Sequence, residues 1–173
     1  MPDIETFKGI FNKGGARQNL FRVSWISPAG GSEGGANHEF YVKATNFPTS
    51  TITPIDVFYQ GRTVKVAGTR PAYTDWTVTV MNDEDFAIRK ELEAWFEKMN
   101  PHDSAVRGEL GFGAYKVDSA FVEAIPKDGG TGPKYEFVGL FPNSIGEISL
   151  DWGTDAIQEY TVTWSFDYFR PIT

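Results

Sequence analysis

Residues 73–100 carry a strand, a tight turn and an amphipathic helix in succession, and this segment constrains the fold more than any other. In Tyr73–Met81, apolar residues alternate with threonines, which is the period-two pattern of a strand with one buried face. After Asn82, which can end the strand and cap a helix, apolar residues recur with the period of an α-helix. We therefore expect one long helix over about 83–99, with Asp83–Asp85 in its first turn. Its expected packing residues are Ile88, Leu92, Trp95 and Phe96.

The rest of the chain is rich in short period-two segments separated by turn residues. Predicted strands cover Asn19–Ile26, His38–Thr45, Ile52–Gln60, Gly61–Val66, Tyr115–Ile125, Tyr135–Phe141, Ser144–Asp151 and a last strand from Ile157 to Tyr168. The first two strands would form one hairpin with a long glycine-rich tip, and Gln60-Gly61 would form the tight turn of a second hairpin. Many short strands and one helix predict a mainly β fold, an antiparallel β-sandwich or barrel with one flanking α-helix.

The sequence shows no internal repeat and no linker, so residues 1–173 are expected to form a single domain. Residues 1–18 are predicted to form an N-terminal arm, in which Phe7, Ile10 and Phe11 are spaced like one short helical turn. Residues 27–38 and 100–114 are predicted loops because they are rich in glycine and polar residues. A further break is expected at Pro142-Asn143, between two short strands.

The charge balance and the residue types argue against several classes of function. The chain carries a formal net charge of −7, whereas binding to a nucleic-acid backbone needs clustered lysines and arginines. It contains no cysteine, which excludes disulfides and thiolate metal sites. The N-terminal residues lack the apolar core of a signal peptide, and no apolar run is long enough to span a membrane. We therefore expect a soluble protein that has no membrane partner.

No catalytic motif in the sequence has the structural context that its chemistry requires, and we expect neither an enzyme nor a cofactor. Residues 30–34 match the letters of the G-x-S-x-G nucleophile elbow, but a strand is expected to follow Ser32, whereas the elbow requires a helix. His38 and His102 are the only histidines, too few for a histidine-rich metal site. The acidic run Asp83–Asp85 is explained by a helix start. A flexible loop is the better interpretation of the Ser32 segment.

The five tryptophans raise the alternative of a sugar-binding platform. Four of them lie in phase with apolar neighbours, which favours core packing: Trp25, Trp76, Trp95 and Trp164. Only Trp152 occupies a turn-like setting.

Several segments together resemble the tail tube protein of contractile-tailed bacteriophages. The resemblance rests on NLFRVSWI at residues 19–26, on the region from FYVKATNFPTS to KVAG at 40–68, and on the strand, turn and helix at 68–99 with its DWTVTVMND stretch. It continues through 138–169, where FPNSIGEISLDW is the most specific piece. The segment 27–38 departs from the family by its length, and 100–134 does not align.

The resemblance implies a structural virion protein. In that family a β-sandwich or barrel with one flanking helix assembles into hexameric rings, which stack into a hollow tube inside a contractile sheath. The implied partners are further copies of the chain, the tail sheath protein, and the baseplate or initiator and terminator proteins. The resemblance also implies that DNA passes through the lumen without specific binding. The implied location is the virion tail, assembled in the host cytoplasm.

By position in the resemblance, the hairpin of residues 47–66 is the candidate for lining the bore and contacting neighbouring subunits. Its candidate residues are Phe47, Asp56, Gln60, Arg62 and Lys65. A further hypothesis is that part of the negative charge lines the bore, so that DNA phosphates find no adhesive wall. Replacing lumen carboxylates with lysine would then slow or trap DNA.

Three alternatives remain open at this point. The first is the tube of a phage-like injection system that carries protein cargo instead of DNA. The second is a monomeric carbohydrate-binding β-sandwich, which predicts a row of exposed aromatic side chains. The third is a small hydrolase built on Ser32.

Overall fold

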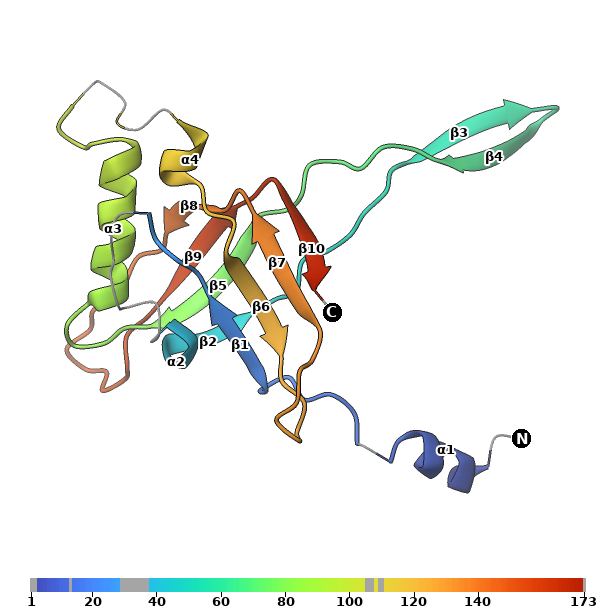
Figure 1. The fold of residues 1–173 in the computed structure, drawn as a ribbon, viewed down its shortest axis with the longest axis horizontal. Helices are drawn as coiled ribbons and strands as arrows, with labels where there is room; N and C mark the ends of the chain where they lie inside the picture. The colour runs from blue at the N-terminus through green and yellow to red at the C-terminus, as the bar shows by residue number, and fades with distance from the viewer. Residues whose placement is uncertain (1–2, 13, 29–37, 105–107, 109–110, 173) are drawn as a thin grey trace.

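The computed structural model describes residues 3–12, 14–28, 38–104, 108 and 111–172 (Figure 1). The described part contains two four-stranded sheets, a separate two-stranded hairpin and four helices. Sheet I has the strand order β1 (Phe21–Ser24), β6 (Ala120–Ala124), β7 (Lys134–Val138) and β10 (Tyr168–Ile172). Sheet II has the order β2 (Val42–Thr45), β5 (Trp76–Met81), β9 (Glu159–Ser165) and β8 (Phe141–Ile145). The hairpin consists of β3 (Pro54–Tyr59) and β4 (Arg62–Ala67), and the helices are α1 (Ile4–Ile10), α2 (His38–Tyr41), α3 (Ala87–Met99) and α4 (Phe112–Tyr115).

All neighbouring strands in both sheets are antiparallel, which confirms the predicted mainly β, antiparallel fold with a flanking helix. The two sheets form a sandwich, and neither closes into a barrel within one chain. Between them lies a core of aromatic rings. Trp164 of sheet II lies 5.1 Å from Trp25, 5.7 Å from Trp95 and 6.3 Å from Trp76, measured between ring centroids. Trp76 in turn stacks on Phe137 of sheet I at 4.3 Å, so the same cluster joins both sheets.

Helix α3 covers the part of the core that sheet I leaves open (Figure 1). Ile88, Leu92 and Trp95 are buried on one side of this helix, whereas Phe96 is half-buried. The indole nitrogen of Trp95 donates a 2.8 Å hydrogen bond to the carbonyl of Tyr115, which ties the helix to the end of α4. These contacts leave only the polar side of α3 on the surface.

The prediction that the long helix begins at Asp83 is wrong, because α3 begins at Ala87. Phe86, just before the helix, has a left-handed backbone with φ of 55°. Asp83 therefore lies in the preceding turn, but its carboxylate accepts a 2.9 Å hydrogen bond from the amide of Ala87. The acidic run still meets the positive end of the helix dipole, from outside the helix instead of from its first turn.

The predicted hairpin between 19–26 and 38–45 is also wrong. Strand β1 pairs with β6 in sheet I and β2 pairs with β5 in sheet II, so the two segments belong to opposite sheets. His38–Tyr41 forms the short helix α2 instead of a strand, which leaves the ring of Phe40 exposed. Most of the predicted loop 27–38 lies outside the described residues, as does part of 100–114, whose end Phe112–Tyr115 forms α4.

Three strand boundaries differ from the prediction near the C-terminus. Strand β8 runs through Pro142, where a break was expected, because an edge strand can carry a residue without an N–H group. No strand follows it up to residue 158. The predicted last strand divides at the bend around Asp167 into β9 and β10, which join different sheets.

Tyr160 offers a test of the core through its pH dependence. Burial raises the pKa of its phenol well above the ordinary value, and the Arg89 guanidinium 5.5 Å from the ring only partly opposes this shift. Above about pH 10 the unfolded chain loses this proton while the folded chain keeps it, so stability should fall as the pH rises. The phenol oxygen also has no hydrogen-bond partner among the described residues.

We therefore expect Tyr160→Phe to stabilise the fold by about 1 kcal/mol at neutral pH and to flatten the stability loss above pH 10. Denaturant titrations of both proteins at several alkaline pH values measure this difference. If the free energy of unfolding decreased equally with alkaline pH in the two proteins, the assignment of the effect to Tyr160 would be contradicted.

Candidate functional site

The hairpin of β3 and β4 projects far from the body of the molecule (Figure 1). Every residue of both strands is exposed. Its turn is formed by Gln60 and Gly61, both with positive φ (46° and 77°), as a two-residue hairpin loop requires and as the sequence predicted. A lone two-stranded hairpin is at best marginally stable in water. A projection of this kind is therefore suited to packing on another molecule.

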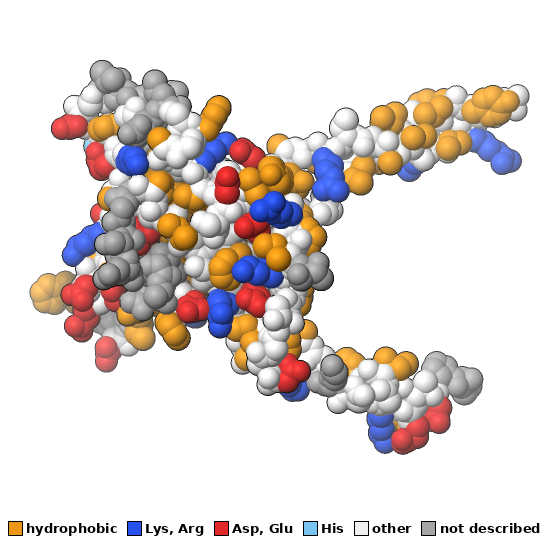
Figure 2. Space-filling view, in the orientation of Figure 1, with side chains coloured by type: hydrophobic (Ala, Val, Ile, Leu, Met, Phe, Trp, Pro, Cys, Tyr) orange, Lys and Arg blue, Asp and Glu red, His pale blue; other side chains and the backbone are white. Residues whose placement is uncertain are grey.

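The strand register divides the hairpin into two unlike faces. One face, called here the apolar face, pairs Ile55 with Val66 and Val57 with Val64. The opposite face, called here the charged face, carries Asp56 and Lys65 side by side, with the Lys65 ammonium 2.9 Å from the Asp56 carboxylate, and also the exposed Phe58 paired with Thr63. Figure 2 shows hydrophobic side chains along much of this projection. Such an exposed apolar strip is characteristic of a protein–protein contact.

The structure separates the predicted site residues of this region. Asp56 and Lys65 lie together on the charged face, whereas Arg62 pairs with Tyr59 on the side of the valines. Gln60 lies in the turn at the tip. Phe47 is not part of the hairpin, because its ring lies on the body, 5.2 Å from that of Tyr135.

At its root, the hairpin is closed by two backbone hydrogen bonds. The amide of Gly68 donates to the carbonyl of Thr53 at 3.0 Å, and the amide of Thr53 donates to the carbonyl of Thr69 at 3.1 Å. A Cβ atom on Gly68 would lie 2.4 Å from the Thr53 carbonyl oxygen and 2.8 Å from the Ile55 side chain. The close approach of the two strands at this point requires glycine.

Gly68→Ala should therefore open the root of the hairpin, at a cost of about 1–3 kcal/mol to its pairing. Hydrogen exchange at the amides of residues 53 and 68 should become faster, while the core amides of β5 and β9 keep their protection. Gly111→Ala serves as the control, since a Cβ there meets nothing within 4 Å. Unchanged exchange at the root would show that the strands accommodate the methyl group.

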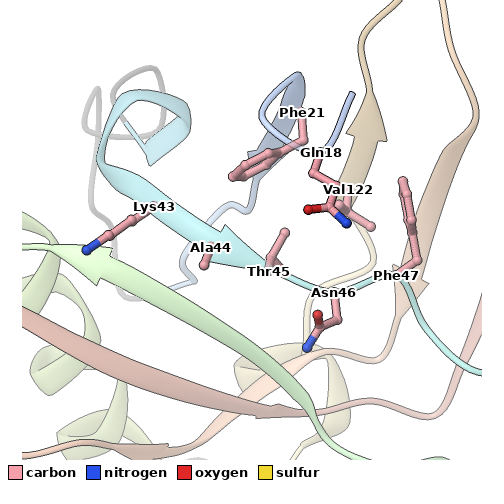
Figure 3. A pocket seen from close by; sticks show the side chains of 8 residues that line it. All are labelled: Gln18, Phe21, Lys43, Ala44, Thr45, Asn46, Phe47 and Val122. Atoms are coloured by element: carbon pink, nitrogen blue, oxygen red, sulfur yellow. The ribbon is translucent and has the colours of Figure 1, made fainter. Parts of the chain in front are cut away.

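Within the part of the chain that the structure describes, both sheets end in strands with no partner on their outer side. The free edges are β1 and β10 in sheet I and β2 and β8 in sheet II. The free edge of β2 borders a cavity of about 480 Å³ that opens between the sheets (Figure 3). It is lined by Gln18, Phe21, Lys43, Ala44, Thr45, Asn46, Phe47 and Val122. Edges with free N–H and C=O groups are templates for pairing with another chain.

The N-terminal arm is a second apolar projection. Helix α1 exposes Ile4, Phe7, Ile10 and the adjacent Phe11, with the rings of Phe7 and Phe11 stacked at 5.5 Å. In Figure 1 the arm and the hairpin leave the same side of the body. The sequence predicted an arm with one helical turn here but assigned it no contact role.

The outward face of sheet II is a polar surface for which the sequence suggested no role. Thr77 lies opposite Thr163, and Thr79 lies opposite Thr161, all on the side of the sheet away from the core. The only signal in the sequence was the alternation of threonine with buried residues.

The described residues do not assemble a catalytic site from the sequence candidates. Ser32 lies outside the described residues, and His102 is an exposed side chain beside Glu97. No group of three or more potential metal ligands occurs among the residues that the structure describes. Within the same residues, none of the helices has the length and apolar character needed to cross a bilayer. Trp25, Trp76, Trp95 and Trp164 are buried, so these rings form no sugar-binding platform.

An antiparallel sandwich with open edges and a projecting apolar hairpin defines a subunit built for assembly. A family model described as phage tail tube protein matches residues 16–171. The chain belongs to the phage tail tube protein family, which confirms the resemblance seen in the sequence. The tail tube protein gp19 of Enterobacteria phage T4 is 37% identical over 157 residues, covering 90% of this chain and 91% of that protein. Its counterpart from Enterobacteria phage T6 is 36% identical over the same shares.

Solved structures with the same fold come from contractile injection systems. The PVC sheath/tube terminator of an extracellular contractile injection system matches with a TM-score of 0.65 at 15% identity, covering 92% of this chain and 97% of that one. The tube-terminating cap of the anti-feeding prophage matches with a TM-score of 0.62, also at 15% identity, covering 92% and 91%. At this level of identity, these similarities show the fold alone.

Proposed function

We propose that this chain forms hexameric rings that stack into the hollow inner tube of a contractile phage tail, through which DNA leaves the virion. Membership of the tail tube family supports this proposal. The observation that carries it is the hairpin, whose strands are exposed along their whole length and whose apolar face lacks any cover among the described residues. An exposed apolar surface of this kind typically marks a contact with another subunit.

The open edges of sheet II account for ring formation. Its four strands alternate in direction from β2 to β8. A neighbour placed beside the subunit in the same orientation therefore brings its β2 antiparallel to the free β8 edge. Repetition of this head-to-tail contact around an axis closes a ring in which both edges of sheet II are paired.

Within this assembly, the hairpin contacts neighbouring subunits and contributes to the bore. Its apolar face, with Ile55, Val57, Val64 and Val66, is proposed to pack on the neighbour. Asp56 and Lys65 then point away from that contact, towards the lumen. Arg62 and Gln60 lie at or beside the tip, within reach of the next subunit, and Phe47 lies where the hairpin leaves the body.

The further partners follow from the same proposal: the tail sheath protein outside the tube, a baseplate or initiator protein at one end and a terminator at the other. The chain has a structural and not an enzymatic role, and it enters the virion after assembly in the host cytoplasm. A tube for protein cargo would use the same fold. The 37% identity to a phage tail tube protein favours DNA.

Negative-stain electron microscopy of the purified chain, with particle size measured in solution, tests the proposal. We expect rings with a central hole, or hollow tubes, once the chain is concentrated or supplied with an initiator. A particle that stays monomeric under both conditions would contradict the proposal.

A further inference from the structure

The edge strand β2 carries one residue more than the stretch of β5 with which it pairs. Val42 lies opposite Val80, and Ala44 lies opposite the next residue along the partner strand, Thr79. Lys43, which stands between Val42 and Ala44, is therefore the additional residue of a β-bulge.

The other edge strand of sheet II, β8, has the same feature. Pro142 lies opposite Trp164, and Ser144 lies opposite the next residue along the partner strand, Thr163. Asn143 is the additional residue here. The inner strands β5 and β9, in contrast, pair over six residues without a shift of register. Sheet II therefore has a regular centre and one lengthened strand at each edge.

Polar side chains tie both additional residues to the centre of the sheet. The Lys43 ammonium forms an ion pair with the carboxylate of Glu159, at the start of β9. The side-chain amide of Asn143 donates a 3.0 Å hydrogen bond to Asp75, immediately before β5, and the same carboxylate accepts a 2.8 Å hydrogen bond from the Ser165 hydroxyl. Each tie spans one intervening strand. The bulges are thus held in place as part of the surface that each edge presents.

In the ring proposed above, β8 of one subunit lies antiparallel to β2 of the next, so the two lengthened edges meet. A bulged strand beside a regular strand leaves one residue without a partner and disrupts the hydrogen-bond ladder at that place. Where both strands carry one additional residue at the same place, their residue counts match and the ladder continues past it. Both strands also bend there, so a matched pair bends together.

We infer that the bulges at Lys43 and Asn143 face each other across the contact between neighbouring subunits and set its register. This inference rests on the proposed function and specifies which residues of the two edges meet. The bulges lie in adjacent rows of sheet II, because Thr79 and Thr77, the partner of Thr163, are two residues apart on β5. Matching them staggers neighbouring subunits along the strands, and a closed barrel requires such a stagger.

Deleting one additional residue at a time tests the match. Deletion of Lys43 makes β2 regular against β5, and deletion of Asn143 makes β8 regular against β9, so both subunits should stay folded. Each single deletion leaves a bulge opposite a regular strand at every ring contact. We expect the concentration needed for assembly to rise by about tenfold or more, because hydrogen-bonded pairs are lost there. Deleting both residues restores the match and should restore assembly.

Lys43→Ala and Asn143→Ala are the controls, because they remove the side-chain ties and keep the number of backbone residues. Both should assemble near the parent concentration, since exposed polar ties contribute little. Single deletions that assemble as readily as the parent would overturn the inference. Easier assembly would show that the bulges protect the edges from pairing, with the same consequence. A folded double deletion that assembles no better than the single deletions would also overturn it.

A disulfide measurement does not depend on the deletions. The chain has no cysteine, and residues 44 and 144 are exposed on opposite edges of sheet II. In a chain with Ala44→Cys and Ser144→Cys, a disulfide joins neighbouring subunits if the bulges match, since its Cα atoms must lie within about 7 Å. We expect covalent hexamers after mild oxidation of assembled tubes. The pair Ala44→Cys and Glu147→Cys, shifted by three residues, should stay monomeric on a denaturing gel.

Covalent hexamers from the shifted pair and not from the matched pair would overturn the inference. Microscopy before oxidation separates the two kinds of failure. A chain that forms neither rings nor tubes refutes the proposed function, whereas tubes that give no hexamer with the matched pair refute the inference alone.

Discussion

Replacing Val64 with aspartate should abolish ring and tube formation while leaving the subunit folded. Val64 pairs with Val57 at the centre of the apolar face of the hairpin. Covering a side chain of this size contributes about 1.5–3 kcal/mol, and burying an unpaired carboxylate in its place adds a further cost. Each 1.4 kcal/mol corresponds to about tenfold in affinity, so we expect the concentration needed for assembly to rise by well over tenfold. Sedimentation together with microscopy measures this concentration.

Thr63→Asp is the matched control for this variant. Thr63 immediately precedes Val64 on β4, belongs to the same exposed strand and pairs with Phe58 on the opposite face. The Thr63→Asp substitution introduces the same charge on the side of the hairpin that is proposed to point to the lumen, so assembly should persist. Measured on dissociated subunits, the melting temperatures of both variants should match that of the parent, because the side chains of the hairpin lie outside the core. Assembly of the Val64 variant at the parent concentration would refute the assignment of the apolar face.

Replacing Trp164 with alanine should destabilise the subunit by about 3–5 kcal/mol, the cost of deleting a large buried aromatic side chain. Trp164 is fully buried and lies between three other tryptophans from β5, α3 and the segment after β1. For a chain of this size, such a loss lowers the melting temperature by about 6–20 °C. Thermal unfolding of the monomer, followed by circular dichroism, measures the effect.

Trp152→Ala is the control for the tryptophan substitution, since Trp152 is fully exposed in the loop before β9. Its replacement should change stability by no more than about 0.5 kcal/mol. Similar losses of stability in the two variants would mean that the aromatic cluster does not hold the two sheets together.

Local patterns in the sequence predicted those parts of the fold that depend on neighbouring residues. The alternation of Trp76, Val78 and Val80 marked the buried face of β5, and the helical spacing from Ile88 onward marked α3. Gln60-Gly61 identified a two-residue hairpin turn because few residue pairs tolerate two positive φ values. In each case the conformation depends on residues that are close together in the sequence.

Strand pairing could not be predicted in the same way. Strand β1 finds its partner β6 about a hundred residues further along the chain, and apolar alternation alone does not distinguish this partner from β2. The segment at His38 had both polar and apolar residues in strand-like order, yet its first turn became helical. Pro142 looked like a strand break only because its place at a sheet edge was unknown.

For the candidate site, the sequence located the hairpin but not its relation to the body. Ile55, Val57, Val64 and Val66 have the composition of core residues, and only the structure reveals that they are exposed. The register then separates Asp56 and Lys65 from Arg62, which the sequence had grouped together. The role of each of these residues in the bore stays a prediction.

The projection of the hairpin from one side of the body has a consequence for the whole assembly. If each subunit binds the next ring through a hairpin on one side only, all rings stack in the same orientation. A tube built this way is polar from end to end. If the hairpins contact the next ring, one end of the tube would present uncovered hairpins and the other end would present the surfaces that the hairpins bind. The protein that starts the tube and the protein that closes it must therefore present different chemistry, and neither can replace the other.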